Sequence, residues 1–151
     1  MSTGQTIFVV VVLSALAFGL WRAVVDGRFR GTHRVRGAAE PAPDPVLGPV
    51  VAGDGIALGE RATLLQFSSA FCAPCRATRR ILDEVSSTMP GVVHLEVDAE
   101  HHLDVVRRLG ILRTPTTLVL DVQGLEVTRA TGAPTKHQVL TALERTVPDE
   151  V

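Results

Sequence analysis

The 151-residue sequence has few cysteines and little excess charge. Its only two cysteines, Cys72 and Cys75, lie three positions apart, so they cannot staple distant parts of a small secreted fold and their role must be local. Fifteen basic residues against sixteen acidic ones leave no global field that would attract nucleic acid, which we exclude as a partner. The length allows one domain of roughly 100 residues and an additional segment at one end.

Charged side chains are absent from Ser2 to Trp21, and residues 7–20 are almost wholly apolar. A helix needs about 20 such residues to span a bilayer, so this stretch is just long enough, with Trp21 placed for the interface. A cleaved signal peptide is the alternative, because residues 15–17 are Ala-Leu-Ala, but the basic residues that precede such a segment are missing. We therefore expect residues 1–25 to be a single-pass transmembrane anchor in the cell membrane.

Basic residues are absent before this span, whereas five arginines follow it within residues 22–36. The bias predicts that the rest of the chain faces the cytoplasm, with an extracytoplasmic orientation as the alternative. Residues 37–49 contain four prolines among alanine, glycine and acidic residues, which is typical of a semi-extended spacer. We expect residues 26–49 to form a basic and then Pro-rich linker that holds a domain of residues 50–151 off the bilayer.

Strand and helix patterns alternate through the remaining sequence. Residues 50–52 and 56–58 favour a short entry hairpin, and residues 63–68 a compact strand that leads into the cysteines. A helix follows, with Ile81, Leu82 and Val85 on one face, and Pro90-Gly91 ends it. The later predictions are a strand at 92–97, a helix at 101–109, hairpin strands at 116–122 and 125–130, and a closing helix at 135–147. The order is βαβαββα.

Three marks make residues from about 50 to 147 resemble the thioredoxin family. They are the sequence Cys72-Ala73-Pro74-Cys75 between a strand and a helix, the Thr114-Pro115 that opens the hairpin, and Gly132-Ala133 before the last helix. The resemblance, closest to its membrane-tethered bacterial branch, implies an α/β thioredoxin-like fold with a central mixed sheet flanked by helices, here preceded by one transmembrane helix. It also implies a thiol-disulfide oxidoreductase that needs no cofactor, acts on protein thiol or disulfide clients and draws on an electron donor.

The two cysteines suit different roles in such chemistry. Cys72 at the first helical turn faces unpaired backbone N–H groups and the positive end of the helix dipole, which favour the reactive thiolate. Cys75, one turn later on the same side, is expected to be the more buried resolving thiol. The resemblance further implies that Thr114-Pro115 is a cis bond whose preceding backbone pairs with an extended client segment across from the cysteines. Candidates for an apolar client patch are Phe67, Phe71, Ile111 and Leu112, although most of them fit the core equally well.

Other interpretations of the cysteine pair remain open. A structural disulfide would close too short a loop to contribute much chain entropy. A zinc site would need further ligands from His94, His101 and His102, without a second cysteine pair, so we predict no metal site. A thioredoxin fold that binds partners without turnover is a third alternative.

Two positions depart from the family pattern. Phe71 precedes Cys72 where the family usually has Trp, and Gln66 stands where reducing thioredoxins carry a buried Asp that helps to deprotonate the resolving thiol. Gln cannot accept that proton, so efficient general reductase activity is in question. His94 stands where those thioredoxins have a Lys beside the Asp, so it is a candidate substitute base, although a partly exposed strand histidine is the simpler interpretation.

Overall fold

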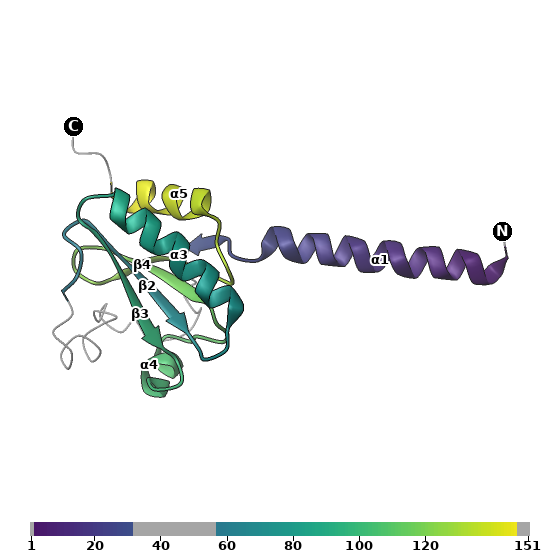
Figure 1. Ribbon diagram of the computed structural model, residues 1–151, viewed down its shortest axis with the longest axis horizontal. Coiled ribbons are helices and arrows are strands. Elements are labelled where there is room, and N and C mark those ends of the chain that lie inside the picture. Colours follow the sequence, from purple (N-terminus) through teal and green to yellow (C-terminus); the bar gives the residue numbers. More distant parts are fainter. Residues whose placement is uncertain (1, 32–56, 148–151) are drawn as a thin grey trace, which may run out of the picture.

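A computed structural model describes residues 2–31 and 57–147 of the chain. It contains a long N-terminal helix followed by a small α/β domain (Figure 1). The elements in chain order are α1 (Thr3–Val25), β1 (Phe29–Gly31), β2 (Ala62–Ser68), α3 (Ala73–Thr88), β3 (Val92–Asp98), α4 (Leu103–Arg108), β4 (Thr116–Leu120), β5 (Glu126–Thr131) and α5 (Lys136–Thr146).

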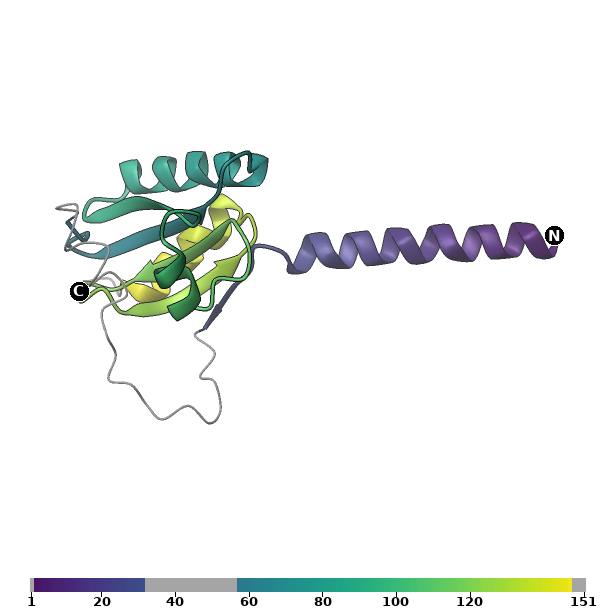
Figure 2. The same cartoon turned by 90° about the horizontal axis from the view of Figure 1, so that it is seen from below.

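The five strands of the described residues form one mixed sheet in the order β1-β5-β4-β2-β3. β2 and β3 are parallel, and the other neighbouring pairs are antiparallel. Helices α3 and α5 cover one face of the sheet, and α4 lies on the other (Figures 1 and 2). The architecture is therefore the predicted thioredoxin-like one, with β2 inside the sheet and leading directly into α3.

Alternation along β2 divides the core into two layers. Leu64 packs with Leu82 and Val85 of α3 on one face, while Leu65 and Phe67 pack toward the α4 side. Every residue of β2 is buried, because the strand has neighbours on both edges and helices over both faces. Since side chains on a strand alternate, Gln66 shares the α3 face with Leu64.

Most predicted elements are confirmed, with ends that shift by a few residues at most. The predicted entry hairpin falls mainly on residues 50–56, which lie outside the described residues, and residues 57–61 contain no strand. β1 was not predicted. It lies within the segment expected to be a linker, and its residues Phe29, Arg30 and Gly31 pair with Ala130, Arg129 and Thr128 of β5.

This strand changes the expected role of the Pro-rich segment. The described chain joins the sheet at Phe29, soon after α1 ends at Val25. The Pro-rich segment lies outside the described residues, but it follows β1 and precedes β2 in the chain. The prediction that it separates the anchor from the domain is therefore wrong, because the connection between α1 and the sheet is made before it.

Helix α1 begins with a capping box, in which the Ser2 side chain accepts from the Gln5 backbone N–H and the Gln5 side chain accepts from the Ser2 N–H. Residues Thr3–Arg22 are long and apolar enough to cross a membrane, and none of that stretch is buried against the domain. The helix projects away from the domain as a single rod (Figure 2). Its length and composition fit the anchor expected from the sequence.

Candidate active site

The connection from β2 to α3 places the first cysteine at a helix start. Cys72 is the N-cap of α3, and Pro74 occupies the first turn. Backbone N–H groups in the first turn of a helix have no carbonyl partner within the helix, so a proline there removes no hydrogen bond. Phe71, the residue just before Cys72, has a φ of 58°. This left-handed conformation costs a non-glycine residue roughly 1–2 kcal/mol, and it turns the chain sharply out of the strand and into the helix.

Cys72 and Cys75 form a disulfide with an S–S distance of 2.04 Å. The sulfur of Cys72 lies 3.1 Å from the backbone nitrogen of Cys75, whose N–H points toward it. Cys72 is partly exposed, whereas Cys75 is only 3% exposed. The predicted difference in exposure is present, with Cys72 partly open to solvent and Cys75 buried.

A second loop faces the cysteines from the other side of the site. The Thr114-Pro115 bond is cis, as the resemblance implied. The Thr114 hydroxyl lies 4.0 Å from the Cys72 sulfur and 2.8 Å from the Ser69 hydroxyl, and the Pro115 carbonyl accepts from the Gly132 N–H at 2.8 Å. Sequence reasoning missed Ser69, because its link to Thr114 joins residues 45 positions apart in the chain.

The floor of the site is polar. Gln66 is fully buried, and its Nε2 donates to the Cys75 carbonyl at 3.0 Å. Its Oε1 has no hydrogen-bond partner among the described residues, and the same holds for the hydroxyls of Thr78 on α3 and Thr117 on β4. Thr117 is the register partner of Gln66, so polar groups gather beneath Cys75, where the rest of this layer is apolar.

Glu96 and His94, which lie on β3 beside Gln66 and Leu64, both have charged partners on α3. Glu96 is the register partner of Gln66 on β3, and it forms an ion pair with Arg79, whose pKa it raises. The Nδ1 of His94 lies 2.6 Å from Asp83, a residue about two turns of α3 beyond Cys75. The Nδ1 of His94 is thus bonded to Asp83, while its Nε2 is buried and has no hydrogen-bond partner among the described residues.

Acidic residues at the end of β3 and just after it support the loop before Cys72. The Glu100 carboxylate accepts from the Ala70 N–H at 3.2 Å, and the Asp98 carboxylate accepts from the Glu100 N–H at 2.9 Å. This backbone hydrogen bond, together with the bond from the His101 ring, lowers the pKa of Asp98. No local sequence pattern indicates this support, because its contacts depend on how the two loops approach each other.

Two large apolar side chains stand at the rim of the site. Phe71 is fully exposed and Leu112 is 94% exposed, whereas the other two candidates for a client patch, Phe67 and Ile111, are buried in the core. The rim therefore presents one apolar side chain beside Cys72 and one beside the Thr114-Pro115 loop. We call Phe71 and Leu112 the apolar rim.

A cysteine pair at a helix start, opposite a cis-proline loop, defines a dithiol-disulfide exchange site. The family model described as Thioredoxin matches residues 54–145, and the chain belongs to the thioredoxin family. This domain is accordingly a thiol-disulfide oxidoreductase domain.

Several thioredoxins resemble the chain over this domain. Thioredoxin H-type 1 of Nicotiana tabacum is 27% identical over 92 residues, which are 61% of this chain and 72% of that protein. Thioredoxin of Methanocaldococcus jannaschii is 30% identical over 81 residues, 52% of this chain and 88% of that protein. Human thioredoxin domain-containing protein 2 is 41% identical over 58 residues, but the match spans only 10% of its length and 38% of this chain.

The solved structures agree with this assignment. The structure of thioredoxin NaTrxh from Nicotiana alata superposes with a TM-score of 0.53 at 25% identity, over 58% of this chain and 75% of that one. Both α1 and β1 precede the residues that the family model matches.

Proposed function

We propose that the chain is a membrane-tethered thiol-disulfide oxidoreductase that reduces protein disulfides, with Cys72 as nucleophile, Cys75 as resolver and Thr114-Pro115 as the client-binding loop. The observation that carries the proposal is the difference between the two sulfurs, one partly exposed at a helix start and one buried below it. The N–H of Cys75, the helix dipole and the Thr114 hydroxyl all favour negative charge on Cys72. The buried position of Cys75 has no comparable access to a client.

Exchange proceeds in two displacements. The Cys72 thiolate attacks one sulfur of a client disulfide, the client S–S bond breaks, and the second client sulfur leaves as a thiolate. The Cys75 thiol then loses its proton and attacks the Cys72 sulfur, which releases the first client sulfur and forms the Cys72–Cys75 disulfide. Two electrons pass from the protein dithiol to the client, and a separate thiol donor must reduce the protein for the next turnover.

The tether rests on α1. Its apolar surface is exposed along the whole candidate span, which a bilayer would cover. Arg22 ends the span, and further arginines follow at 28, 30, 34 and 36, so the positive-inside bias supports a cytoplasm-facing domain. The opposite orientation would direct the same chemistry to disulfides outside the cytoplasm.

Insulin reduction by the full chain in detergent tests the activity. We expect turnover with a dithiol donor, its loss in Cys72→Ser, and accumulation of mixed disulfides in Cys75→Ser, because only the first variant lacks the attacking thiolate. Equal adduct formation by both variants would contradict the assigned roles. A wild-type chain without turnover would favour a thioredoxin fold that serves only as a binding module.

Thiol labelling in intact cells tests the orientation. With the pair reduced, Cys72 should resist a membrane-impermeant maleimide until the membrane is permeabilised. Labelling in intact cells would place the domain outside the cytoplasm, and the tether itself would be contradicted if the chain were extracted by carbonate washing.

A further inference from the structure

We propose that the active site is held facing the bilayer surface, so that its clients are disulfides in membrane proteins, located just outside the hydrocarbon core. This inference rests on the membrane tether proposed above and names the substrate class of the same site. It follows from where the end of α1 meets the domain, from the depth that the span assigns to this junction, and from the apolar rim.

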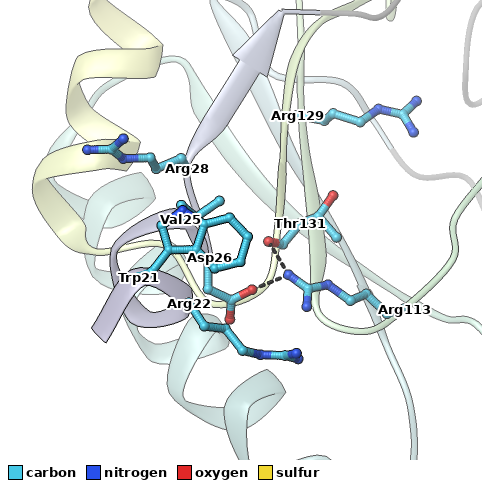
Figure 3. Close-up of a pocket in the computed structure, with 8 residues that line it drawn as sticks. All are labelled: Trp21, Arg22, Val25, Asp26, Arg28, Arg113, Arg129 and Thr131. Carbon is cyan, nitrogen blue, oxygen red and sulfur yellow. Dashed lines mark hydrogen bonds and ion pairs between the residues drawn. The ribbon is translucent and has the colours of Figure 1, made fainter. Parts of the chain in front are cut away.

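The junction between α1 and the domain is closely packed. Asp26, the C-cap of α1, forms an ion pair with Arg113, whose guanidinium also donates to the Thr131 carbonyl at 2.9 Å (Figure 3). The Gly27 N–H donates to the same carbonyl at 3.0 Å. A Cβ on Gly27 would lie 2.1 Å from the Ala133 carbonyl oxygen, so the backbones approach as closely as glycine permits. These contacts hold the C-cap of α1 and the residue after it against the domain, so they fix the point at which α1 leaves it.

The same junction adjoins the active site. Arg113 immediately precedes Thr114, whose hydroxyl is 4.0 Å from the Cys72 sulfur. In both overall views, the start of α3 lies on the side of the domain from which α1 leaves (Figures 1 and 2). The edge of the domain that carries Cys72 is thus the edge that faces along α1, toward the membrane.

The span places this edge at the level of the lipid headgroups. The candidate span ends at Arg22, and Asp26 follows four residues later, which is a rise of roughly 6 Å along a helix. A pocket of about 400 Å³ at the junction is lined by Trp21, Arg22 and Arg28 among others (Figure 3). Aromatic and basic side chains of this kind concentrate at membrane interfaces, where arginines contact anionic headgroups.

The apolar rim lies on the same edge of the domain as Cys72. Phe71 directly precedes Cys72 and Leu112 lies two residues before Thr114, so both stand on the membrane-facing edge with their side chains exposed. In bulk water such exposure has no compensation, but beside a bilayer these side chains meet an interfacial environment or the apolar flank of a client's membrane segment. The occupant we assign is the juxtamembrane segment of a membrane protein, with its disulfide at Cys72 and its apolar flank on the rim.

Fluorescence quenching in vesicles tests the orientation without using catalysis. The full chain carrying Cys72→Ser and Cys75→Ser receives one dye, through Leu112→Cys in one sample and Gln123→Cys in the other. Gln123 lies in the turn between β4 and β5, at the far end of β4 from Thr114-Pro115. Both samples are inserted in phosphatidylcholine-phosphatidylglycerol vesicles that contain a headgroup-labelled quencher lipid.

We expect several-fold stronger quenching of the dye at position 112 than at position 123. Equal quenching, or stronger quenching at 123, in a chain that floats with the vesicles would overturn the orientation while leaving the tether and the redox chemistry intact. A chain that does not float with vesicles would overturn the tether and this inference together. The proposed redox activity would be unaffected, because insulin reduction tests it separately.

Client preference is tested with two lipid-linked peptides that carry the same disulfide on a short or a long spacer. The wild-type chain in vesicles should reduce the short-spacer peptide at least as fast as the long-spacer one, and much slower reduction of the short-spacer peptide would overturn the substrate class. A Gly/Ser insertion of about ten residues after Val25, between α1 and the residues that contact the domain, adds roughly 17 Å on average and should make the long-spacer peptide the faster substrate. The same insertion after Pro45 is the matched control, because it follows β1, and it should leave the preference unchanged.

Discussion

The side-chain amide of Gln66 donates a hydrogen bond of 3.0 Å to the backbone carbonyl of Cys75. This contact confirms that position 66 lies directly beneath the cysteine pair, where the family resemblance placed it. A neutral amide now occupies the floor under the buried sulfur, and the nearby Glu96 carboxylate is held by Arg79. The proton that Cys75 must lose during resolution therefore has no carboxylate acceptor among the contacts described for this floor.

Gln66→Asp should speed the release of mixed disulfides near neutral pH, because a buried carboxylate supplies a base for Cys75. It should also destabilise the oxidised protein by about 1–3 kcal/mol, since the bond to the Cys75 carbonyl is lost and a carboxylate is buried without a partner. Single-turnover release and thermal unfolding across pH measure both effects. Gln66→Asn is the matched control, because Asn has the same length as Asp but no charge. Equal release by the two variants would show that the carboxylate does not act as a base. His94→Ala tests the remaining candidate base, because the Nε2 of His94 is buried without a partner among the described residues: slower release would identify His94 as the base, and unchanged release would exclude it.

Thr114→Val should slow the alkylation of reduced Cys72 several-fold at pH 6–7, because a hydroxyl that can donate to the sulfur is replaced by a methyl group. The pH dependence of iodoacetamide labelling measures this directly. Thr116→Val is the matched control, since its hydroxyl donates to the Arg113 carbonyl instead. If both variants show the wild-type labelling profile, Thr114 does not stabilise the thiolate.

Asp98→Asn should lower the unfolding temperature at pH 6 and have no effect in strong acid. The pKa of Asp98 is lowered in the folded protein by the Glu100 N–H and the His101 ring. A lowered carboxyl pKa stabilises the fold above the unfolded value, near pH 4, and this contribution disappears as the pH falls through the folded pKa. Thermal unfolding between pH 2.5 and pH 6 checks the sign, and a difference between wild type and variant that grows toward acid would contradict it.

Gly27→Ala should destabilise the junction by more than the cost of backbone conformation alone. Its φ is +74°, and a Cβ would lie 2.1 Å from the Ala133 carbonyl oxygen. Gly110→Ala is the control, because Gly110 has a similar φ of +63° but open space within 4 Å of where its Cβ would stand. Both should lose about 1–2 kcal/mol from the left-handed conformation, and Gly27→Ala should lose more. Chemical denaturation followed by circular dichroism measures both losses. Equal losses in the two variants would show that the close approach is absent.

Local patterns were sufficient to predict much of this fold. The strand before Cys72, the helix after Cys75 and the stop at Pro90-Gly91 each follow from a few adjacent residues, and the structure has all three. The cis bond at Thr114-Pro115 followed from the family resemblance carried by the same motifs. The position of Gln66 beneath the cysteines likewise followed from the resemblance, in which the residue at this spacing before Cys72 is a buried acid.

Contacts between distant segments were not predictable in the same way. β1 has only three residues with an arginine in the middle, so it shows no apolar alternation, and it becomes a strand through its pairing with β5. The bond between Ser69 and Thr114 and the support of Ala70 by Glu100 likewise depend on how loops meet. His94 is a candidate base because of its position in the sequence, but the bond of its Nδ1 to Asp83 on the neighbouring helix could not be predicted from that position.

The pairing of β1 with β5 also sets an order of assembly. Phe29 pairs with Ala130, so β1, which is synthesised first, can join the sheet only after β5, the last strand, has formed. Closing such a long loop costs entropy, which favours late docking of β1 onto an already formed β2-β3-β4-β5 core. Folding of the domain and the seating of its anchor should therefore finish in a single final step.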